Sequence, residues 1–310
     1  MKSSQSLTDL LTIKDLSLTE LNNLLEKAKE YKHFLNGSSH YSTELQGKTV
    51  GLLFYEPSTR TKCSFQLACD YLGAHHLSIS KSGSSFVKGE TLKDTAWNLH
   101  AMGVDLVVMR HPVSGAAKYL STKLSIPVVN AGDGMHAHPT QALLDIFTMQ
   151  EHLGTLQNKI VTIAGDIRHS RVARSNIHAL NMLGAKVRLV APKTFIPKGI
   201  ENMGVQVFTD LQSAISEADV IMALRIQKER QLAGYIPSLG EYAKFFGINQ
   251  HNIKDTEGFL IMHPGPMNRG VEISTEFADS PQSVILRQVP NGVAVRMAIL
   301  ATLLGGKEDE

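Results

Sequence analysis

The stretch KTVGLLFYEPSTRTKCSFQLACDYLGAHHLSIS, residues 48–80, decides the fold class. Residues 48–56 form a short, mostly apolar run with the length of a buried strand, and residues 75–80 form a second one. Residues 58–72 between them have the pattern of a helix, and Gly73 provides a helix end. A strand, a helix and a second strand in this order predict a βαβ unit, in which the two strands are parallel.

The same alternation continues along the chain. Before it, Ser17-Leu18-Thr19-Glu20 is a capping box that starts an amphipathic helix ending before residue 36. After it, we expect strands at residues 105–110, 127–131, 159–166, 186–191, 205–209, 219–225 and 258–263, and helices from about residue 91 and at 113–123, 139–152, 170–183 and 293–304. The sequence therefore predicts an α/β protein with mostly parallel sheets flanked by helices.

Two domains are expected, because 310 residues exceed what a single hydrophobic core usually supports. A polar break at residues 154–158 separates two series of strands and helices. We predict a first domain at residues 1–150 and a second at residues 151–290. The terminal helix, within residues 291–310, is expected to pack back on the first domain.

Charge and composition exclude several classes of function. Lys and Arg number 31 against 29 Asp and Glu, so no overall field attracts nucleic acid or an anionic membrane. No stretch approaches the ~18 apolar residues of a membrane span, and the first residues lack a signal-peptide core. Cys63 and Cys69 lie six residues apart in one predicted helix, so their side chains point to different sides of that helix. This argues against a disulfide or a metal knuckle. We expect a cytoplasmic protein that binds neither nucleic acid nor membranes.

Polar and cationic residues follow the predicted strands. In open α/β sheets, ligands bind outside the carboxyl ends of the strands. The residues at these places are Pro57 to Thr61, Arg110 to Pro112 and Gly132 to Gln141 in the first domain, and Gly165, Asp166, Arg171, Arg225 to Gln227 and His263 to Pro266 in the second. Their gathering predicts a site for anionic ligands.

The segment Ser58-Thr59-Arg60-Thr61 is a candidate phosphate cradle, because hydroxyls, backbone N–H groups and a guanidinium meet in the first turn of a helix. The alternative is a Ser58 N-cap beside a solvated Arg60. Arg110 suits a carbonyl or phosphate oxygen, and its alternative is a surface position. If either alternative holds, the residues concerned do not bind an anion.

His136 and His138 raise the alternative of zinc, but no further Cys or His stands at ligand spacing. A neutral His138 that donates to a substrate oxygen is the preferred interpretation. Asp166 is not preceded by a G-x-G-x-x-G motif, which argues against a dinucleotide site. We expect no metal and no cofactor.

As a set, these motifs resemble the aspartate/ornithine carbamoyltransferase family over nearly the whole chain. The resemblance is carried by Ser58-Thr59-Arg60-Thr61, Lys88-Gly89-Glu90-Thr91, Arg110-His111-Pro112, His138-Pro139-Thr140-Gln141, Arg171, Arg225-Ile226-Gln227 and His263-Pro264-Gly265-Pro266. It implies a first domain that binds carbamoyl phosphate and a second that binds aspartate. It also implies a homotrimer whose active sites lie at subunit boundaries.

The resemblance also implies roles for individual residues. Carbamoyl phosphate would be bound by Ser58, Thr59, Arg60, Thr61, Arg110, His138, Gln141 and the backbone of Gly265 and Pro266. Aspartate would be bound by Lys88, Arg171, Arg225 and Gln227, and the neighbouring subunit would lend a loop with Ser84 and Lys88. The catalytic set would be Arg60, Thr61, Lys88, Arg110 and His138.

The implied reaction follows from charge. Carbamoyl phosphate and aspartate together bring about four negative charges, which repel each other unless fixed cations lie between them. Five cations are offered, namely Arg60, Lys88, Arg110, Arg171 and Arg225. The aspartate amine would attack the carbonyl carbon without a covalent enzyme intermediate. Thr61, Arg110 and His138 would meet the oxygen that becomes negative.

Other functions remain as alternatives. Within the family, ornithine would need a carboxylate partner for its ammonium group, whereas the second domain offers Arg171 and Arg225. Ornithine members also carry a Cys in the motif that here reads His263-Pro264-Gly265-Pro266, so Gly265 favours aspartate. One departure is that Met267-Asn268-Arg269-Gly270 follows the motif, whereas some aspartate members have Arg directly there. From other classes, an oxidoreductase lacks its glycine motif, and a catalytically silent partner predicts loss of the cations. The resemblance leaves open whether a regulatory chain or a dihydroorotase partner attaches.

Overall fold

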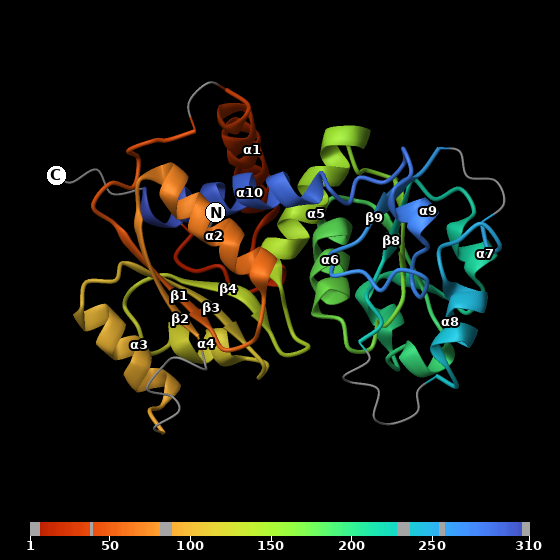
Figure 1. Ribbon diagram of the computed structural model, residues 1–310, viewed down its shortest axis with the longest axis horizontal. Helices are drawn as coiled ribbons and strands as arrows, with labels where there is room; N and C mark the ends of the chain where they lie inside the picture. The colour runs from red at the N-terminus through yellow and green to blue at the C-terminus, as the bar shows by residue number, and fades with distance from the viewer. Residues whose placement is uncertain (1–6, 38–39, 81–88, 228–235, 254–257, 306–310) are drawn as a thin grey trace. The chain divides into compact units, whose positions relative to one another are not determined.

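The computed structural model describes residues 7–37, 40–80, 89–227, 236–253 and 258–305. The chain divides into two compact units, which Figure 1 shows with their elements labelled. Unit 1 comprises residues 1–144 and 289–310, and unit 2 comprises residues 145–288. The chain therefore returns to unit 1 after completing unit 2.

Unit 1 contains a four-stranded parallel sheet in the order β2-β1-β3-β4. Its strands are β1 (Thr49–Phe54), β2 (His75–Ser80), β3 (Leu106–His111) and β4 (Val128–Asp133). Its helices are a 3-10 turn (Ile13–Asp15), α1 (Leu18–Leu35), α2 (Thr59–Leu72), α3 (Leu92–Ala101), α4 (Ala116–Ser121), most of α10 (Gln288–Leu304) and the start of α5 (Pro139–Leu153).

Helices cover both faces of this sheet. Apolar residues of α3 and α4 pack on one face against Leu53, Val107 and Met109. On the other face lie α2 and α10, as Figure 1 shows. The Arg296 guanidinium of α10 lies 5.1 Å from the ring centre of Phe65 in α2. Strands β1, β3 and β4 are thus mostly buried, as expected for parallel strands between two layers, whereas the edge strand β2 is largely exposed.

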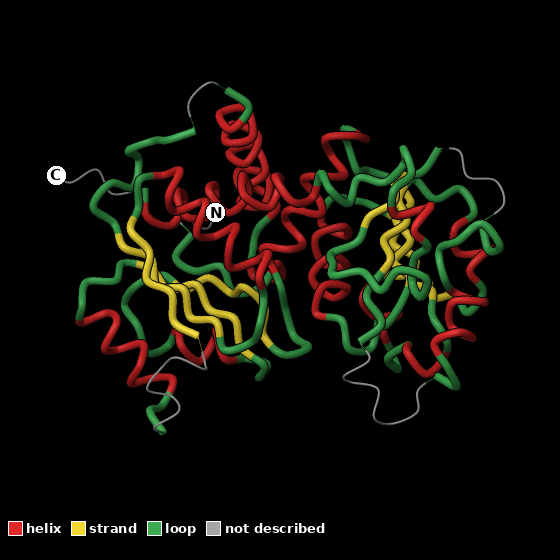
Figure 2. The backbone as a smooth tube through the Cα atoms, in the orientation of Figure 1, coloured by secondary structure: helices red, strands yellow, loops and turns green. Residues whose placement is uncertain are grey.

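Unit 2 contains a five-stranded parallel sheet in the order β7-β6-β5-β8-β9. Figure 2 shows its strands in yellow with helices in red around them. Its strands are β5 (Ile160–Ala164), β6 (Lys186–Val190), β7 (Val205–Phe208), β8 (Val220–Ala223) and β9 (Leu260–Met262). Its helices are α6 (Arg171–Met182), α7 (Leu211–Ile215), α8 (Leu239–Phe246), α9 (Thr275–Ala278), most of α5 and two 3-10 turns (Lys193–Phe195 and Ile200–Met203).

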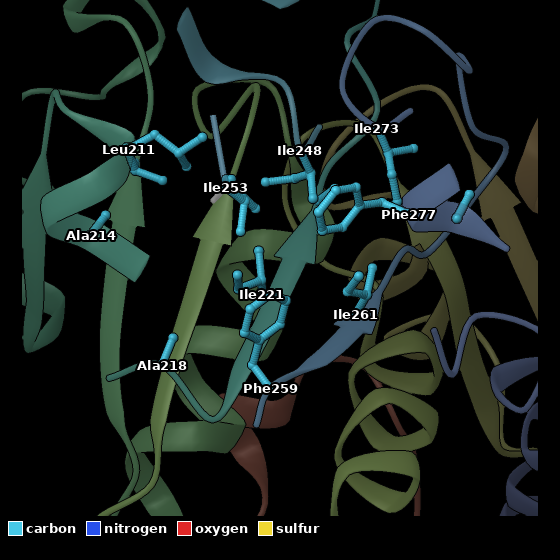
Figure 3. Packing of buried hydrophobic residues seen from close by; sticks show 14 of the residues in the cluster. Leu211, Ala214, Ala218, Ile221, Ile248, Ile253, Phe259, Ile261, Ile273 and Phe277 are labelled. Atoms are coloured by element: carbon cyan, nitrogen blue, oxygen red, sulfur yellow. The ribbon is translucent and has the colours of Figure 1, made fainter. Parts of the chain in front are cut away.

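An apolar cluster packs around β8 and β9 of unit 2. Ile221 of β8 and Ile261 of β9 belong to one cluster with side chains of α7, of α9 and of the loop around Ile248, which Figure 3 labels. Each of these three isoleucines is fully buried. Burying one such side chain contributes ~1.5–3 kcal/mol. The cluster therefore stabilises β8 and β9 and the starts of the loops that follow them.

The predicted alternation of parallel strands and helices is confirmed. The capping box is also confirmed, because the Ser17 hydroxyl accepts from the Glu20 N–H and the Glu20 carboxylate accepts from the Ser17 N–H. The predicted start of the last helix is wrong, since α10 begins at Gln288 and not at Val293. Pro290 lies in its first turn, where proline's missing N–H has no helical partner to lose. Helix α8 was not predicted.

Candidate active site

The strand order places a ligand-binding point in each unit. In unit 1 the chain extends from β1 to β2 on one side and reaches β3 and β4 on the other, so the order reverses between β1 and β3. In unit 2 it reverses between β5 and β8. The carboxyl ends of strands at such reversals are where open α/β sheets bind ligands. The segments after β1, β3, β5 and β8 therefore carry the candidate site.

The N-terminus of α2 follows β1 and is arranged for an anion. Ser58 is the N-cap residue, but its side chain does not make the usual cap hydrogen bond. By contrast, Ser17, Thr91, Ser170, Ser238 and Ser274 all cap their helices through the side chain. The side-chain cap of the alternative interpretation is therefore absent, although Ser58 is the N-cap residue and Arg60 is exposed, as that interpretation expects. The first turn of α2 contains no acidic residue, and it presents Thr59, Arg60 and Thr61.

The side chains in this turn differ in exposure. Thr61 is buried, whereas Arg60 is exposed. Partial desolvation nevertheless lowers the pKa of the Arg60 guanidinium, which stays charged at neutral pH. The turn therefore combines backbone N–H groups, hydroxyls and a permanent cation, which is what a phosphate group requires.

Arg110 stands at the end of β3, where three groups hold it. Its guanidinium lies 2.6 Å from a Glu56 carboxylate oxygen, 3.3 Å from the Ala131 carbonyl and 3.4 Å from His138 Nε2. Both partners of the Glu56 pair are mostly buried. Because arginine is always a donor, the His138 ring nitrogen accepts here. An anionic ligand at Arg110 has to share the guanidinium with Glu56.

His138 directly precedes α5 and Gln141 lies in its first turn, and both residues are buried. The loop before them is organised by Asp133, a fully buried carboxylate at the end of β4. It accepts from the Gly115 N–H at 2.6 Å, the Ala137 N–H at 3.1 Å and the Asn130 amide at 2.8 Å, and it lies 3.1 Å from His136 Nδ1. Asp133 thus ties the loop that precedes His138 to the loop after β3.

Replacing Asp133 with asparagine is expected to lower the free energy of unfolding by about 1.5–3 kcal/mol, because an amide group would face donors in a buried position. Urea unfolding followed by circular dichroism measures this loss. Asp70→Asn is the matched control, since Asp70 is exposed and pairs only with His76 at 3.4 Å among the contacts described. Equal midpoints for the two variants would contradict the role given to Asp133.

In unit 2, the loop between β5 and α6 presents a second cluster. Asp166 is fully buried, and its two oxygens lie 2.9 and 3.0 Å from His169 Nδ1. The Gln227 amide donates to the His169 carbonyl at 3.3 Å, which joins the loops after β5 and β8. Arg171 is buried as the first residue of α6, although the helix dipole disfavours a cation there. Helix stability alone therefore does not explain a cation at this position.

Gly165 brings the same two loops into close contact. Its φ is +134°, and an added Cβ would lie 2.7 Å from the Leu224 carbonyl oxygen and 2.9 Å from the Leu224 Cβ. Leu224 directly precedes Arg225, which is half-buried. The position of Arg225 therefore depends on the absence of a side chain at residue 165.

We expect Gly165→Ala to lower the free energy of unfolding by about 1–3 kcal/mol and to raise the KM for a substrate that binds at Arg225. Gly154→Ala is the control that separates backbone strain from steric overlap. Gly154 also has positive φ, but an added Cβ there would have nothing within 4 Å. It should cost about 1–2 kcal/mol and leave the KM unchanged. The steric argument is wrong if both variants change the KM equally.

The turn after β9 contains Gly265 with φ +64° and a cis bond to Pro266. The Gly265 N–H donates to His263 Nδ1 at 2.7 Å. Of the predicted site residues, unit 1 contains Ser58 to Thr61, Arg110, His138 and Gln141, and unit 2 contains Arg171, Arg225, Gln227, Gly265 and Pro266. Ser84 and Lys88 lie outside the described residues.

Sequence reasoning missed the carboxylates that hold the cations and loops, above all Glu56 and Asp133. One signal was available for Glu56, because it follows β1 just as Arg110 ends β3, and Phe54 pairs with Arg110 across the two strands. His136 lies beside Asp133, whereas His138 lies beside Arg110. Among the described residues, no group of three or more His, Cys, Asp or Glu could hold a metal ion. No helix in those ranges is long and apolar enough to cross a bilayer.

Two family models match the chain. Residues 8–151 match the carbamoyl-P binding domain of aspartate/ornithine carbamoyltransferase, and residues 157–303 match its Asp/Orn binding domain. The aspartate carbamoyltransferase catalytic subunit of Halothermothrix orenii is 52% identical over 97% of this chain and 96% of its own length. The subunit of that name from Opitutus terrae is 50% identical with the same coverage.

Solved structures agree with this match. Aspartate transcarbamoylase from Trypanosoma cruzi in complex with N-(phosphonacetyl)-L-aspartic acid has a TM-score of 0.87 at 31% identity, with 96% of each chain covered. Ornithine carbamoyltransferase from Pyrococcus furiosus has a TM-score of 0.86 at 30% identity, with 98% of this chain and 100% of the other covered. The chain therefore belongs to the aspartate/ornithine carbamoyltransferase family.

Proposed function

We infer that this chain transfers the carbamoyl group of carbamoyl phosphate to the amine of L-aspartate, which gives N-carbamoyl-L-aspartate and phosphate. A C–N bond forms at the carbonyl carbon and the C–O bond to phosphate breaks. The departing phosphate takes up a proton that the amine loses, so no oxidant, reductant or covalent enzyme intermediate is needed. This reaction would serve an early step of pyrimidine synthesis.

The observation that carries this function is the identity to curated relatives. Relatives named as aspartate carbamoyltransferase catalytic subunits are 49–52% identical over nearly their full length. Solved structures do not separate the two activities, because aspartate transcarbamoylase from Trypanosoma cruzi is 31% identical and ornithine carbamoyltransferase from Pyrococcus furiosus is 30% identical. The same fold serves both activities, so the fold alone does not choose between them. The names of the relatives that are 49–52% identical support aspartate.

In unit 1, we propose that the first turn of α2 binds the phosphate of carbamoyl phosphate. Ser58 to Arg60 supply an uncapped helix start and a guanidinium, and Arg110, His138 and Gln141 surround the carbamoyl group. Thr61, Arg110 and His138 then meet the carbonyl oxygen as it becomes negative. Loss of one such donor typically raises the barrier by about 2.7–4 kcal/mol.

In unit 2, we propose that Arg171, Arg225 and Gln227 bind the two carboxylates of aspartate, while the backbone of Gly265 and Pro266 meets the carbamoyl amide. A buried cation at the start of α6 and a second one after β8 suit a dianionic amino acid. The ammonium side chain of ornithine would be repelled by these groups. The charge of unit 2 therefore agrees with the choice of aspartate.

We further propose a cytoplasmic homotrimer in which a neighbouring subunit lends Ser84 and Lys88. Strand β2 is an edge of its sheet and exposes Leu77, and α2 exposes Leu67 nearby, where the Gln66 amide donates to the Ser78 hydroxyl. An exposed edge strand with apolar neighbours is a surface that another chain tends to cover. Cys63 and Cys69 are both free thiols, which suits a reducing compartment.

One assay tests the function directly. The purified protein is supplied with carbamoyl phosphate and either aspartate or ornithine, and the carbamoylated product and free phosphate are both measured. We expect product only with aspartate. Product only with ornithine, or release of phosphate without product, would overturn the proposal.

A further inference from the structure

Glu272 is a buried carboxylate, 1% exposed, in the loop that follows the Gly265 turn. Its oxygens accept from the Asn268 N–H at 2.5 Å, the Asn268 amide at 3.1 Å and the Ile226 N–H at 3.5 Å, and they lie 3.2 Å from His263 Nε2. These four donors match the lone pairs of an ionised carboxylate. The contacts therefore allow the charge to remain in a buried place.

Asn268 completes the hold on Ile226 from the other side. Its amide donates to the Ile226 carbonyl at 3.1 Å while also donating to Glu272. The N–H of Ile226 is thus bound by Glu272 and its carbonyl by Asn268. The Ile226 side chain is fully buried, whereas Arg225 and Gln227 on either side are half-buried. Because the backbone of Ile226 is held on both sides, the backbone positions of Arg225 and Gln227 are fixed as well.

Glu272 also sets the state of His263. The Gly265 N–H donates to His263 Nδ1 at 2.7 Å, so Nδ1 must be an acceptor, and the proton has to reside on Nε2, which faces Glu272. The imidazole is neutral in this arrangement. A single carboxylate consequently holds both the turn with Gly265 and the segment 225–227.

The sequence departure Met267 to Gly270 is what makes this arrangement. The Val271 N–H donates to the Asn268 carbonyl at 3.0 Å and the Gly270 N–H to the Ile273 carbonyl at 2.8 Å, which forms a tight turn. Arg269 points away and makes two 2.8 Å contacts with Asp279 at the surface. Asn268 faces inward as a result.

We propose that Asn268 and Glu272 are positioning residues for aspartate, which act by holding Arg225, Gln227 and the Gly265 turn in one arrangement. This proposal rests on the proposed function, because it takes Arg225 and Gln227 as aspartate-binding residues. Neither Asn268 nor Glu272 needs to touch the substrate.

The test compares Asn268→Ala and Glu272→Gln with Arg269→Ala, which removes a neighbouring surface cation. We expect the KM for aspartate to rise roughly 10-fold or more in the first two variants, since each loses hydrogen bonds to a charged group. The KM for carbamoyl phosphate, bound in unit 1, should stay within about twofold. Arg269→Ala should stay within about twofold for both substrates.

The outcomes separate this proposal from the proposed function. If the unaltered protein does not carbamoylate aspartate, the proposed function is wrong. If it does and Asn268→Ala keeps a normal KM for aspartate, the positioning role is wrong. A purely structural role predicts a lower urea midpoint with both KM values unchanged, which also overturns the proposal. Should Glu272→Gln fail to fold, Asn268→Ala decides, because Asn268 is only partly buried.

Discussion

Replacing Arg60 with alanine is expected to lower kcat/KM for carbamoyl phosphate at least ~100-fold and to leave the urea unfolding midpoint unchanged. Arg60 lies in the first turn of α2, where the Ser58 hydroxyl leaves the helix start uncapped. Removing the guanidinium takes away the permanent cation of the proposed phosphate cradle. The fold should not suffer, because the side chain is exposed and alanine favours helices.

Lys62→Ala is the matched control for this prediction. Lys62 stands two residues further along the same helix and carries the same charge, but it is not among the proposed ligands. Initial rates at varied carbamoyl phosphate and saturating aspartate, measured for both variants, give the comparison. An equal loss in Lys62→Ala would show that a general field is at work and not a contact at Arg60. A near-normal rate in Arg60→Ala would remove Arg60 from the site.

The order of strands and helices was predictable because its signals are local. The predicted limits of β2, residues 75–80, agree with the structure, and the predicted end of α2 is correct at Leu72, where Gly73 adopts φ +74°. The order of strands within each sheet is not local, since it depends on pairs such as Val50 with Leu106. The two points of reversal, which locate the site, therefore became visible only in three dimensions.

Arg110 and Arg225 could be singled out in the sequence because each stands at or just after the end of a buried strand. Their partners could not be predicted in the same way. Glu56 is separated from Arg110 by 54 residues, and Glu272 from Ile226 by 46 residues. A carboxylate in a loop looks solvated in the sequence, and only the fold shows that donors surround it. For the same reason, the sequence alone does not explain why Met267-Asn268-Arg269-Gly270 follows the family motif, since the contacts of Asn268 with Ile226 appear only in the fold.

Replacing Arg225 with alanine is expected to raise the KM for aspartate ~100-fold or more and to leave the KM for carbamoyl phosphate within about twofold. Arg225 belongs to unit 2, two residues beyond β8, whereas the proposed phosphate cradle belongs to unit 1. A guanidinium that binds a carboxylate with two hydrogen bonds makes a strong, charge-assisted contact. Its loss removes that contact and leaves the bound carboxylate without its countercharge.

Arg225→Lys tests whether geometry or charge alone is required. Lysine keeps the charge but has no planar fork, so we expect it to recover only a small part of the affinity for aspartate. Steady-state rates at varied aspartate and saturating carbamoyl phosphate provide the measurement. If Arg225→Lys restores the full affinity, the carboxylate is held by charge alone, and the precise hold of Asn268 and Glu272 on the neighbouring Ile226 loses its purpose. If both variants raise the two KM values equally, Arg225 does not select aspartate, and the assignment of the two substrates to separate units is wrong.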